Sequence, residues 1–120
     1  METTIPASIS LDDVLEVELE VIGPRAGATH GEPVESALGL SSDGLVETGV
    51  WEVTPGTFPG AKDGICELMH FVAGHGTITG DDGTVTRIGP GVVMFTPDGW
   101  RGTWDVQETV RKTYVIVRTR

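Results

Sequence analysis

One carboxylate in this sequence lies inside an otherwise apolar predicted strand. Glu67 alternates with Met69 and Phe71 in the run ICELMHFVAG. Side chains two residues apart share one face of a β-strand, so we expect Glu67 to point into the core beside these apolar residues. Burial of a carboxylate is costly unless a cation or a hydrogen-bond donor compensates for it. The sequence therefore predicts a buried partner for Glu67.

The last predicted strand offers a cation and a phenol with the same alternation. Lys112, Tyr114 and Ile116 fall on one face of the segment 111–117. An inward Lys112 can pair with Glu67, and Tyr114 adds a hydroxyl group. A carboxylate, an ammonium group and a phenol in a low-dielectric site suit general acid–base catalysis, so we predict Glu67, Lys112 and Tyr114 as catalytic residues. The alternative is a structural ion pair beside a core phenol, without catalysis.

Large apolar side chains are expected to wall a ligand pocket around these groups. Aromatic and other apolar side chains line most small-molecule sites. We predict substrate-binding roles for Trp51, Phe58, Met69, Phe71, Phe95 and Trp104. The alternative for the tryptophans is plain packing, because large aromatic side chains dominate core energetics.

Short strands joined by turns are expected to position these residues. The segment 65–88 predicts a hairpin whose turn is Gly80-Asp81-Asp82-Gly83. Further strands are predicted over 17–21 at a sheet edge and over 45–54, 92–95, 101–106 and 111–117, with loops over 24–43 and 58–63. Eight or nine short strands without a confident helix predict an all-β sandwich or barrel. We expect one domain over 1–120, with an N-terminal strand and covering loop over 1–44 and a barrel core over 45–118.

Composition narrows the classes of partner. Eighteen acidic and eight basic side chains give a formal charge of −10, which disfavours nucleic acids and anionic membranes as partners. The single cysteine, Cys66, excludes an internal disulfide and a multi-cysteine zinc site. The N-terminus lacks the basic flank and apolar run of an export signal. We therefore expect a cytoplasmic protein that binds a small molecule.

Two spaced motifs resemble those of the cupin superfamily of small jelly-roll barrels. Glu67 and Gly74 fit a glutamate, six residues and a glycine, and Gly91, Pro97 and Gly99 fit the second motif. A wider set resembles the cupin subfamily named for ureidoglycine aminohydrolase and, more distantly, the ethanolamine-utilisation cupins: Trp51, Thr54-Pro55-Gly56, Phe58, Asp82-Gly83, Trp104-Asp105-Val106, Arg111-Lys112 and Tyr114. The resemblance implies a single jelly-roll barrel of antiparallel strands. Together with the acidic edge strand predicted near Val17, it also implies a homodimer.

The sequence departs from the metal-binding cupins at their histidine ligands. Those cupins carry two histidines shortly before the glutamate and a third in the second motif. Here Gly60 to Asp63 and Gly102 occupy these places, and none of His30, His70 and His75 falls at a ligand position. A transition-metal site needs three or four converging donors, so we predict no metal and no cofactor.

These features predict a metal-independent, non-redox enzyme that uses general acid–base chemistry in the barrel. Suitable reactions are elimination, isomerisation, cyclisation or hydrolysis at a carbonyl or imine carbon. Two alternatives stay open. One is a non-catalytic dimeric cupin that binds or senses a metabolite through the same residues, and the other is a divalent-metal-dependent aminohydrolase.

Overall fold

The computed structural model describes residues 4–120, which form eight antiparallel strands and no helix. The all-β fold class predicted from the sequence is confirmed. The strands are β1 (Glu20–Pro24), β2 (Val34–Ser42), β3 (Val46–Val53), β4 (Gly56–Ala61), β5 (Ile65–Gly80), β6 (Val85–Ile88), β7 (Val93–Thr96) and β8 (Arg101–Arg118). Within the described residues no helix has the length and apolarity needed to cross a membrane.

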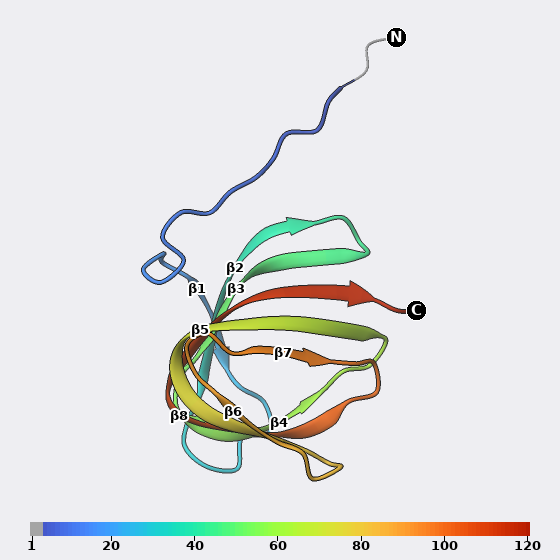
Figure 1. Ribbon diagram of the computed structural model, residues 1–120. Helices are drawn as coiled ribbons and strands as arrows, with labels where there is room; N and C mark the ends of the chain where they lie inside the picture. Colours follow the sequence, from blue (N-terminus) through green and yellow to red (C-terminus); the bar gives the residue numbers. More distant parts are fainter. Residues whose placement is uncertain (1–3) are drawn as a thin grey trace.

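Two long strands, β5 and β8, form the centre of the sheet that makes the barrel. β5 and β8 pair with each other, and the sheet follows the order β1-β2-β3-β8-β5-β6, with β4 added on β8 and β7 on β5 (Figure 1). The β5–β8 register shifts repeatedly between Phe71 and Gly76, and such bulges bend strands enough to close a barrel. Gly74 lies in this bend with φ 87°, and a Cβ there would collide with the carbonyl oxygen of Thr109, so only glycine fits.

The core fills the barrel with apolar side chains from its inner face. Alternation along β5 buries Met69 and Phe71 completely and leaves Leu68 on the outer face, 45% exposed. The core cluster comprises Val53, Phe58, Met69, Phe71, Ile78, Ile88, Trp104, Val106 and Val110. The inward orientation of Glu67, which is 3% exposed, follows from the same alternation.

The structure corrects the prediction at three places. Strand β2 runs through the predicted loop 24–43, β4 occupies most of the predicted loop 58–63, and the two strands predicted over 101–117 are one continuous strand, β8. β2 and β4 are rich in small residues, glycine or proline, whose intrinsic β-propensity is low. Pairing with β1, β3 and β8 supplies the hydrogen bonds that their composition does not predict.

The N-terminal edge strand is confirmed only in its second half. β1 begins at Glu20 and pairs with β2 at the edge of the sheet. Before it, the chain turns tightly at Asp13, and the Arg111 guanidinium donates hydrogen bonds to the carbonyl oxygens of Val14 and Val17, at 3.0 and 2.8 Å. These side-chain contacts hold the backbone in a turn and leave it without a strand partner. The segment ahead of the turn leads away from the barrel (Figure 1).

Candidate functional site

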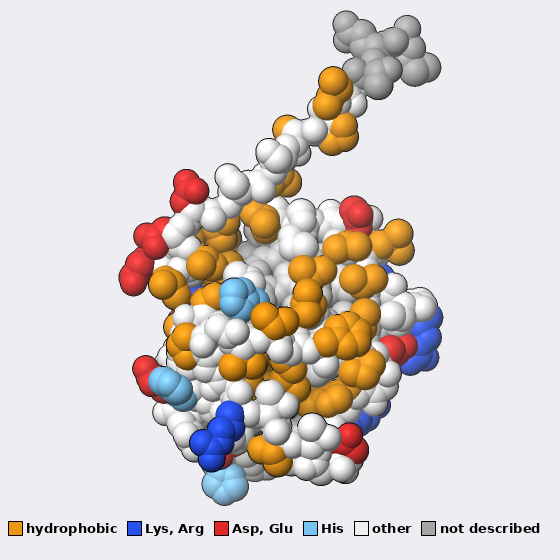
Figure 2. All heavy atoms as spheres, viewed as in Figure 1, with side chains coloured by type: hydrophobic (Ala, Val, Ile, Leu, Met, Phe, Trp, Pro, Cys, Tyr) orange, Lys and Arg blue, Asp and Glu red, His pale blue; other side chains and the backbone are white. Residues whose placement is uncertain are grey.

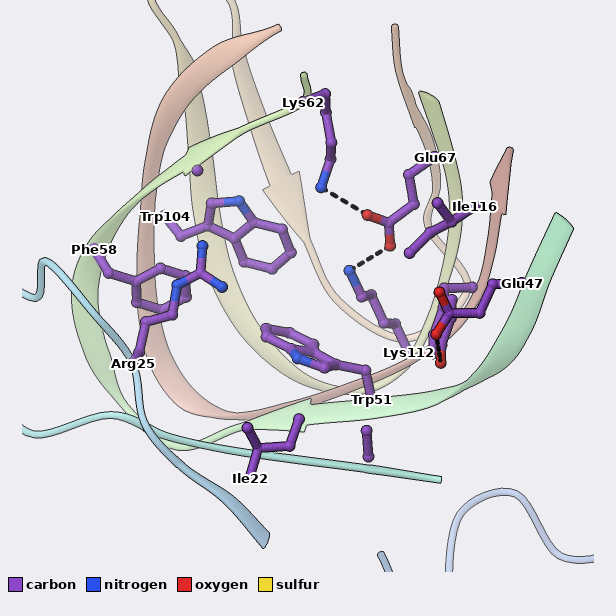
Figure 3. Close-up of a pocket in the computed structure, with 13 residues that line it drawn as sticks. Ile22, Arg25, Glu47, Trp51, Phe58, Lys62, Glu67, Trp104, Lys112 and Ile116 are labelled. Atoms are coloured by element: carbon purple, nitrogen blue, oxygen red, sulfur yellow. Dashed lines mark hydrogen bonds and ion pairs between the residues drawn. The ribbon is translucent and has the colours of Figure 1, made fainter. Parts of the chain in front are cut away.

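Three charged side chains meet inside the barrel. The Glu67 carboxylate on β5 accepts a hydrogen bond from Lys112 Nζ on β8 and another from Lys62 Nζ, which follows β4, each at 2.7 Å (Figure 3). The side chains of Glu67 and Lys112 are buried, at 4% and 5% exposed, and that of Lys62 is partly buried, at 14%. Lys62 and Lys112 are the only lysines of the chain. The predicted contact between Glu67 and Lys112 is present, and Lys62 completes a triad.

Backbone contacts set the position of each member of this triad. In the β5–β8 ladder Glu67 lies opposite Ile116, and Phe71 lies opposite Lys112. The backbone N–H of Lys62 donates to the Trp100 carbonyl oxygen at 2.9 Å, and the Lys62 carbonyl oxygen accepts from Gly99 at 2.7 Å. These bonds tie the end of β4 to the turn before β8. Lys62 therefore approaches Glu67 from the side opposite β8.

Two indole rings surround the Lys112 ammonium group. Its Nζ lies 4.5 Å from the ring centroid of Trp51 and 5.1 Å from that of Trp104. Trp51 is the direct neighbour of Lys112 across the β3–β8 ladder, which explains the first contact. Trp104 meets Trp51 edge to face and stacks on Phe58. The aromatic rings attract the cation and exclude water from it.

Burial and neighbouring charges have different net effects on the pKa values of Glu67 and Lys112. Burial raises the pKa of Glu67, but the ammonium groups of Lys112 and Lys62 outweigh it, so the net shift is downward. Burial lowers the pKa of Lys112 to about 8; the Glu67 carboxylate opposes this shift, and the positive charges of Lys62 and Arg25 add to it. The asymmetry arises because one carboxylate is shared by two cations. The triad therefore carries an excess positive charge in a buried site.

The triad forms one end of a cavity of about 270 Å³. The lining side chains belong to Ile22, Arg25, Ala37, Glu47, Trp51, Phe58, Gly60, Lys62, Glu67, Trp104, Lys112, Tyr114 and Ile116. The cavity is small, and its wall combines four aromatic side chains with five charged ones. Apolar walls with a few convergent polar groups are typical of small-molecule sites. It can admit a compact polar metabolite beside the Glu67–Lys112 pair.

Six of the nine predicted site residues line this cavity. They are Trp51, Phe58, Glu67, Trp104, Lys112 and Tyr114. Met69 and Phe71 are fully buried in the core behind it and do not reach it.

Phe95 lies outside the barrel, contrary to the prediction that it lines the pocket. It is 57% exposed, whereas its neighbour Thr96 is 1% exposed and lies opposite Glu67 in the β5–β7 ladder. Successive side chains of a strand point to opposite faces, so Phe95 points outward because Thr96 points inward. The register of β7 on β5 decides this orientation.

Tyr114 lines the cavity but does not bind Glu67. Its hydroxyl group donates to Glu47 Oε1 on β3 at 3.4 Å, a long hydrogen bond. Burial and the Glu47 carboxylate raise the pKa of Tyr114, so the phenol stays protonated at neutral pH. Tyr114 and Glu47 thus form a second polar pair in the cavity wall.

Three charged residues of the cavity escaped the sequence prediction: Arg25, Glu47 and Lys62. Lys62 falls in the stretch where metal-binding cupins carry histidines, and that position was the one available signal. Arg25 lies in the segment predicted as a loop; its guanidinium donates to Glu35 and to the Pro59 carbonyl oxygen, both at 3.0 Å, and lies over the Phe58 ring. No sequence pattern distinguished Arg25 or Glu47 from other charged residues.

The donor set around Glu67 does not fit the metal site of the metal-binding cupins. Both carboxylate oxygens face ammonium groups, which repel a cation. A side chain at Gly60 or Gly102 would meet the indole rings of Trp100 or Trp104, so aromatic rings occupy the space of the missing histidines. Among residues 4–120 no three His, Cys, Asp or Glu side chains come together as metal ligands, and no histidine lines the cavity.

Comparisons with solved structures find proteins that share the fold of this chain. The chain is similar to the EutQ protein of Clostridium difficile, with 21% identity over 72% of this chain and 70% of that one and a TM-score of 0.63. It is similar to a DUF861-family protein of unknown function from Pseudomonas syringae pv. tomato, with 24% identity, a TM-score of 0.77 and coverage of 88%. This chain spans 46% of the length of that protein. Ectoine synthase from P. lautus has 18% identity over 72% of this chain and 64% of that one, with a TM-score of 0.62. Identities this low show the fold alone.

The family assignment rests on a sequence model. No functionally curated protein matches the chain. The model of the EutQ-like cupin domain matches residues 40–114, well over half of the chain. The cupin resemblance is thereby confirmed, and the closer resemblance to the ureidoglycine aminohydrolase type stays a prediction. The chain belongs to the family of EutQ-like cupin domains.

Proposed function

We propose that this protein is an enzyme that binds a small carbonyl or imine compound in the barrel and moves protons on it without a metal or a redox cofactor. The observation that carries the proposal is the Glu67 carboxylate, held at 2.7 Å from two ammonium groups at the end of an aromatic cavity. Glu67 accepts or returns the proton, and Lys112 stabilises the negative charge that develops on the substrate. Elimination, isomerisation, cyclisation and hydrolysis are all served by these two roles.

A second candidate is a non-catalytic cupin that holds or senses a metabolite. It is favoured by the saturation of the triad: each Glu67 oxygen already accepts a hydrogen bond, and no buried side-chain polar atom of the described residues lacks a partner. In that case the triad is a structural element that shapes the cavity. The distinction rests on turnover, because both candidates bind the ligand in the same place.

A panel of small carbonyl and imine compounds tests the proposal, with tryptophan fluorescence reporting binding and NMR reporting conversion. For a compound that is turned over, Glu67→Gln and Lys112→Met are each expected to lower turnover by at least about 100-fold while binding partly survives. Glu108→Gln is the matched control, because it removes a carboxylate from the exposed pair with His75. Full turnover in both cavity variants would contradict the catalytic roles. Binding by the wild type without turnover would favour the second candidate.

We further propose that the protein is a homodimer whose subunits meet through the outer face of β5, β7 and β8. Four exposed apolar side chains lie there: Leu68, Val93, Phe95 and Val115. Leu68 is paired with Phe95 on one side and with Val115 on the other, so the patch is continuous, and apolar side chains gather on this face in Figure 2. A symmetric contact between two copies would cover the patch on both.

Phe95→Asp is expected to convert the dimer to a monomer, because it places a charge inside the apolar contact. Light scattering after size exclusion measures the mass. Val85→Asp, on β6 and equally exposed but outside the patch, is the control and is expected to stay dimeric. A monomeric wild type at micromolar concentration would contradict this interface. The cytoplasmic location stays a prediction.

A further inference from the structure

The two lysines of this chain converge on one carboxylate, and only one of them is enclosed by aromatic rings. Lys112 lies between Trp51 and Trp104 with its side chain 5% exposed, and it lines the cavity. Lys62 reaches the same carboxylate from the other side and is more exposed, at 14%. A structural ion pair needs one cation. The second cation, Lys62, disfavours the protonated form of Lys112.

An amine becomes a nucleophile when its protonated form is disfavoured. Removal from water disfavours the ammonium form of Lys112, and a neighbouring cation disfavours it further. Both conditions hold, because the amine is buried and Lys62 shares the one carboxylate that Lys112 contacts within residues 4–120. At the same time Glu67 Oε2, at 2.7 Å from Lys112 Nζ, is in place to relay protons to and from the groups that react.

We propose that Lys112 is a covalent nucleophile that forms an imine with a small oxo acid bound in the cavity. This inference rests on the proposed function, since it uses the same cavity and the same proton-transfer pair, and it names the substrate class. Lys112 then binds the substrate carbon directly, in addition to stabilising charge nearby.

The reaction balances with the groups present. The Lys112 ammonium group first releases its proton to water, leaving a neutral amine beside an ionised Glu67. The nitrogen lone pair forms a bond to the carbonyl carbon, the C=O π electrons move to oxygen, and a proton moves from nitrogen to that oxygen to give a carbinolamine. Glu67 relays a proton from water to the hydroxyl group, the C–O bond breaks and water leaves. The product is a protonated imine beside an ionised Glu67, and no oxidant or reductant is consumed.

The charges of the cavity favour an anionic carbonyl compound. Three cations, Arg25, Lys62 and Lys112, line it against two carboxylates, Glu47 and Glu67, in a chain whose overall charge is −10. The guanidinium of Arg25 has five N–H groups and donates to two acceptors among the described residues. Arg25 and Glu47 lie on opposite sides of the cavity (Figure 3). A substrate carboxylate near Arg25 would be kept away from Glu47 while its carbonyl group faces Lys112.

Reductive trapping tests the imine on the wild-type protein. The protein is incubated with glyoxylate and cyanoborohydride, and the modified residue is located by mass spectrometry of proteolytic fragments. We expect a carboxymethyl group on Lys112, formed roughly 100-fold faster at pH 7 than on N-acetyl-lysine, because an amine with a pKa of about 8 is far more often neutral.

The pH dependence should report the amine within its charged surroundings. The groups that face Lys112 are Glu67 from β5, Lys62 after β4, Arg25 at the end of β1, and the Glu47–Tyr114 pair of β3 and β8. The labelling rate is expected to rise with pH to a plateau, with a midpoint near 8. A midpoint above 10, as for a solvated lysine, would overturn the proposal.

Arg25→Gln tests the oxo-acid class separately. On the alkaline plateau of the labelling rate, where Lys112 is neutral in both proteins, this variant is expected to slow labelling by glyoxylate about ten-fold or more and to leave labelling by the uncharged aldehyde propanal within about two-fold. Equal loss with both probes would overturn the assignment of Arg25 to the substrate carboxylate.

The site of labelling separates this inference from the proposed function. Labelling of Lys62 as fast as Lys112, or of Lys112 no faster than N-acetyl-lysine, overturns the imine. If tryptophan fluorescence shows glyoxylate bound while Lys112 stays unmodified, the cavity remains a ligand site and only the proposal of an imine is contradicted. The proposed function fails by another signature, full turnover in Glu67→Gln and Lys112→Met.

Discussion

Replacing Glu67 with glutamine is expected to lower the free energy of unfolding by about 3–5 kcal/mol at pH 7, because the buried Lys112 and the partly buried Lys62 lose their shared counter-charge. The amide of glutamine can accept one hydrogen bond, but it carries no charge to offset either lysine. Urea denaturation followed by tryptophan fluorescence measures the change. Lys112→Met should cost less, since it leaves Glu67 paired with Lys62 one to one.

Two further variants control for the origin of this loss. Glu108→Gln breaks an exposed pair, whose side chains are 63% and 67% accessible, and is expected to cost less than about 1 kcal/mol. The triple variant Glu67→Leu, Lys62→Met and Lys112→Met removes every charge of the triad and should recover most of the stability, because apolar replacements of buried ion pairs are often neutral. A loss below about 1 kcal/mol in Glu67→Gln would show that water solvates the two lysines, contrary to their burial.

The second large effect is a rise in stability with pH on the alkaline side. The pKa of Lys112 is lowered from 10.5 to about 8 in the folded protein, so between these values the unfolded chain binds more protons. Stability then increases with pH. The cost of burying the ammonium group is present below about pH 8 and is relieved as the pH rises toward 10.5. This difference between the two pKa values corresponds to about 3 kcal/mol in the free energy of unfolding.

The comparison with Lys112→Met isolates this contribution. Other groups titrate in the same range, among them Tyr114, whose raised pKa makes the folded state less stable above pH 10. Subtracting the unfolding free energy of Lys112→Met from that of the wild type at each pH removes most of these shared changes. The difference is expected to grow in favour of the wild type between pH 8 and 10.5. Parallel curves would mean that Lys112 keeps an ordinary pKa.

Both effects bear on what the cavity is for. A triad with one carboxylate and two cations is a poor choice for stability alone, since a single pair would leave no excess charge in the core. The extra cation lowers the proton affinity of Lys112, which is useful for chemistry on a carbonyl group. A stability cost of this kind at a cavity wall favours a functional role for the triad over a structural one.

Local pattern in the sequence was sufficient for the inner face of the two central strands. The alternation of Glu67, Met69 and Phe71, and of Lys112 and Tyr114, depends only on the two-residue period of a strand. It predicted the contact between Glu67 and Lys112, and the motif spacing around Glu67 predicted a cupin barrel. The indole rings of Trp51 and Trp104 were also expected beside these groups, and both line the cavity.

Tertiary structure alone decided the contacts that depend on register. Whether Phe95 points in or out follows from how β7 pairs with β5, and the partner of Tyr114 follows from how β3 pairs with β8. The strands β2 and β4 form because neighbouring strands supply their hydrogen bonds. The residue types of β2 and β4 alone do not predict a strand. Lys62 reaches Glu67 because the end of β4 is tied to the turn before β8. The second cation of the triad is thus a product of long-range pairing, and a single sequence carries no periodic signal for such a contact.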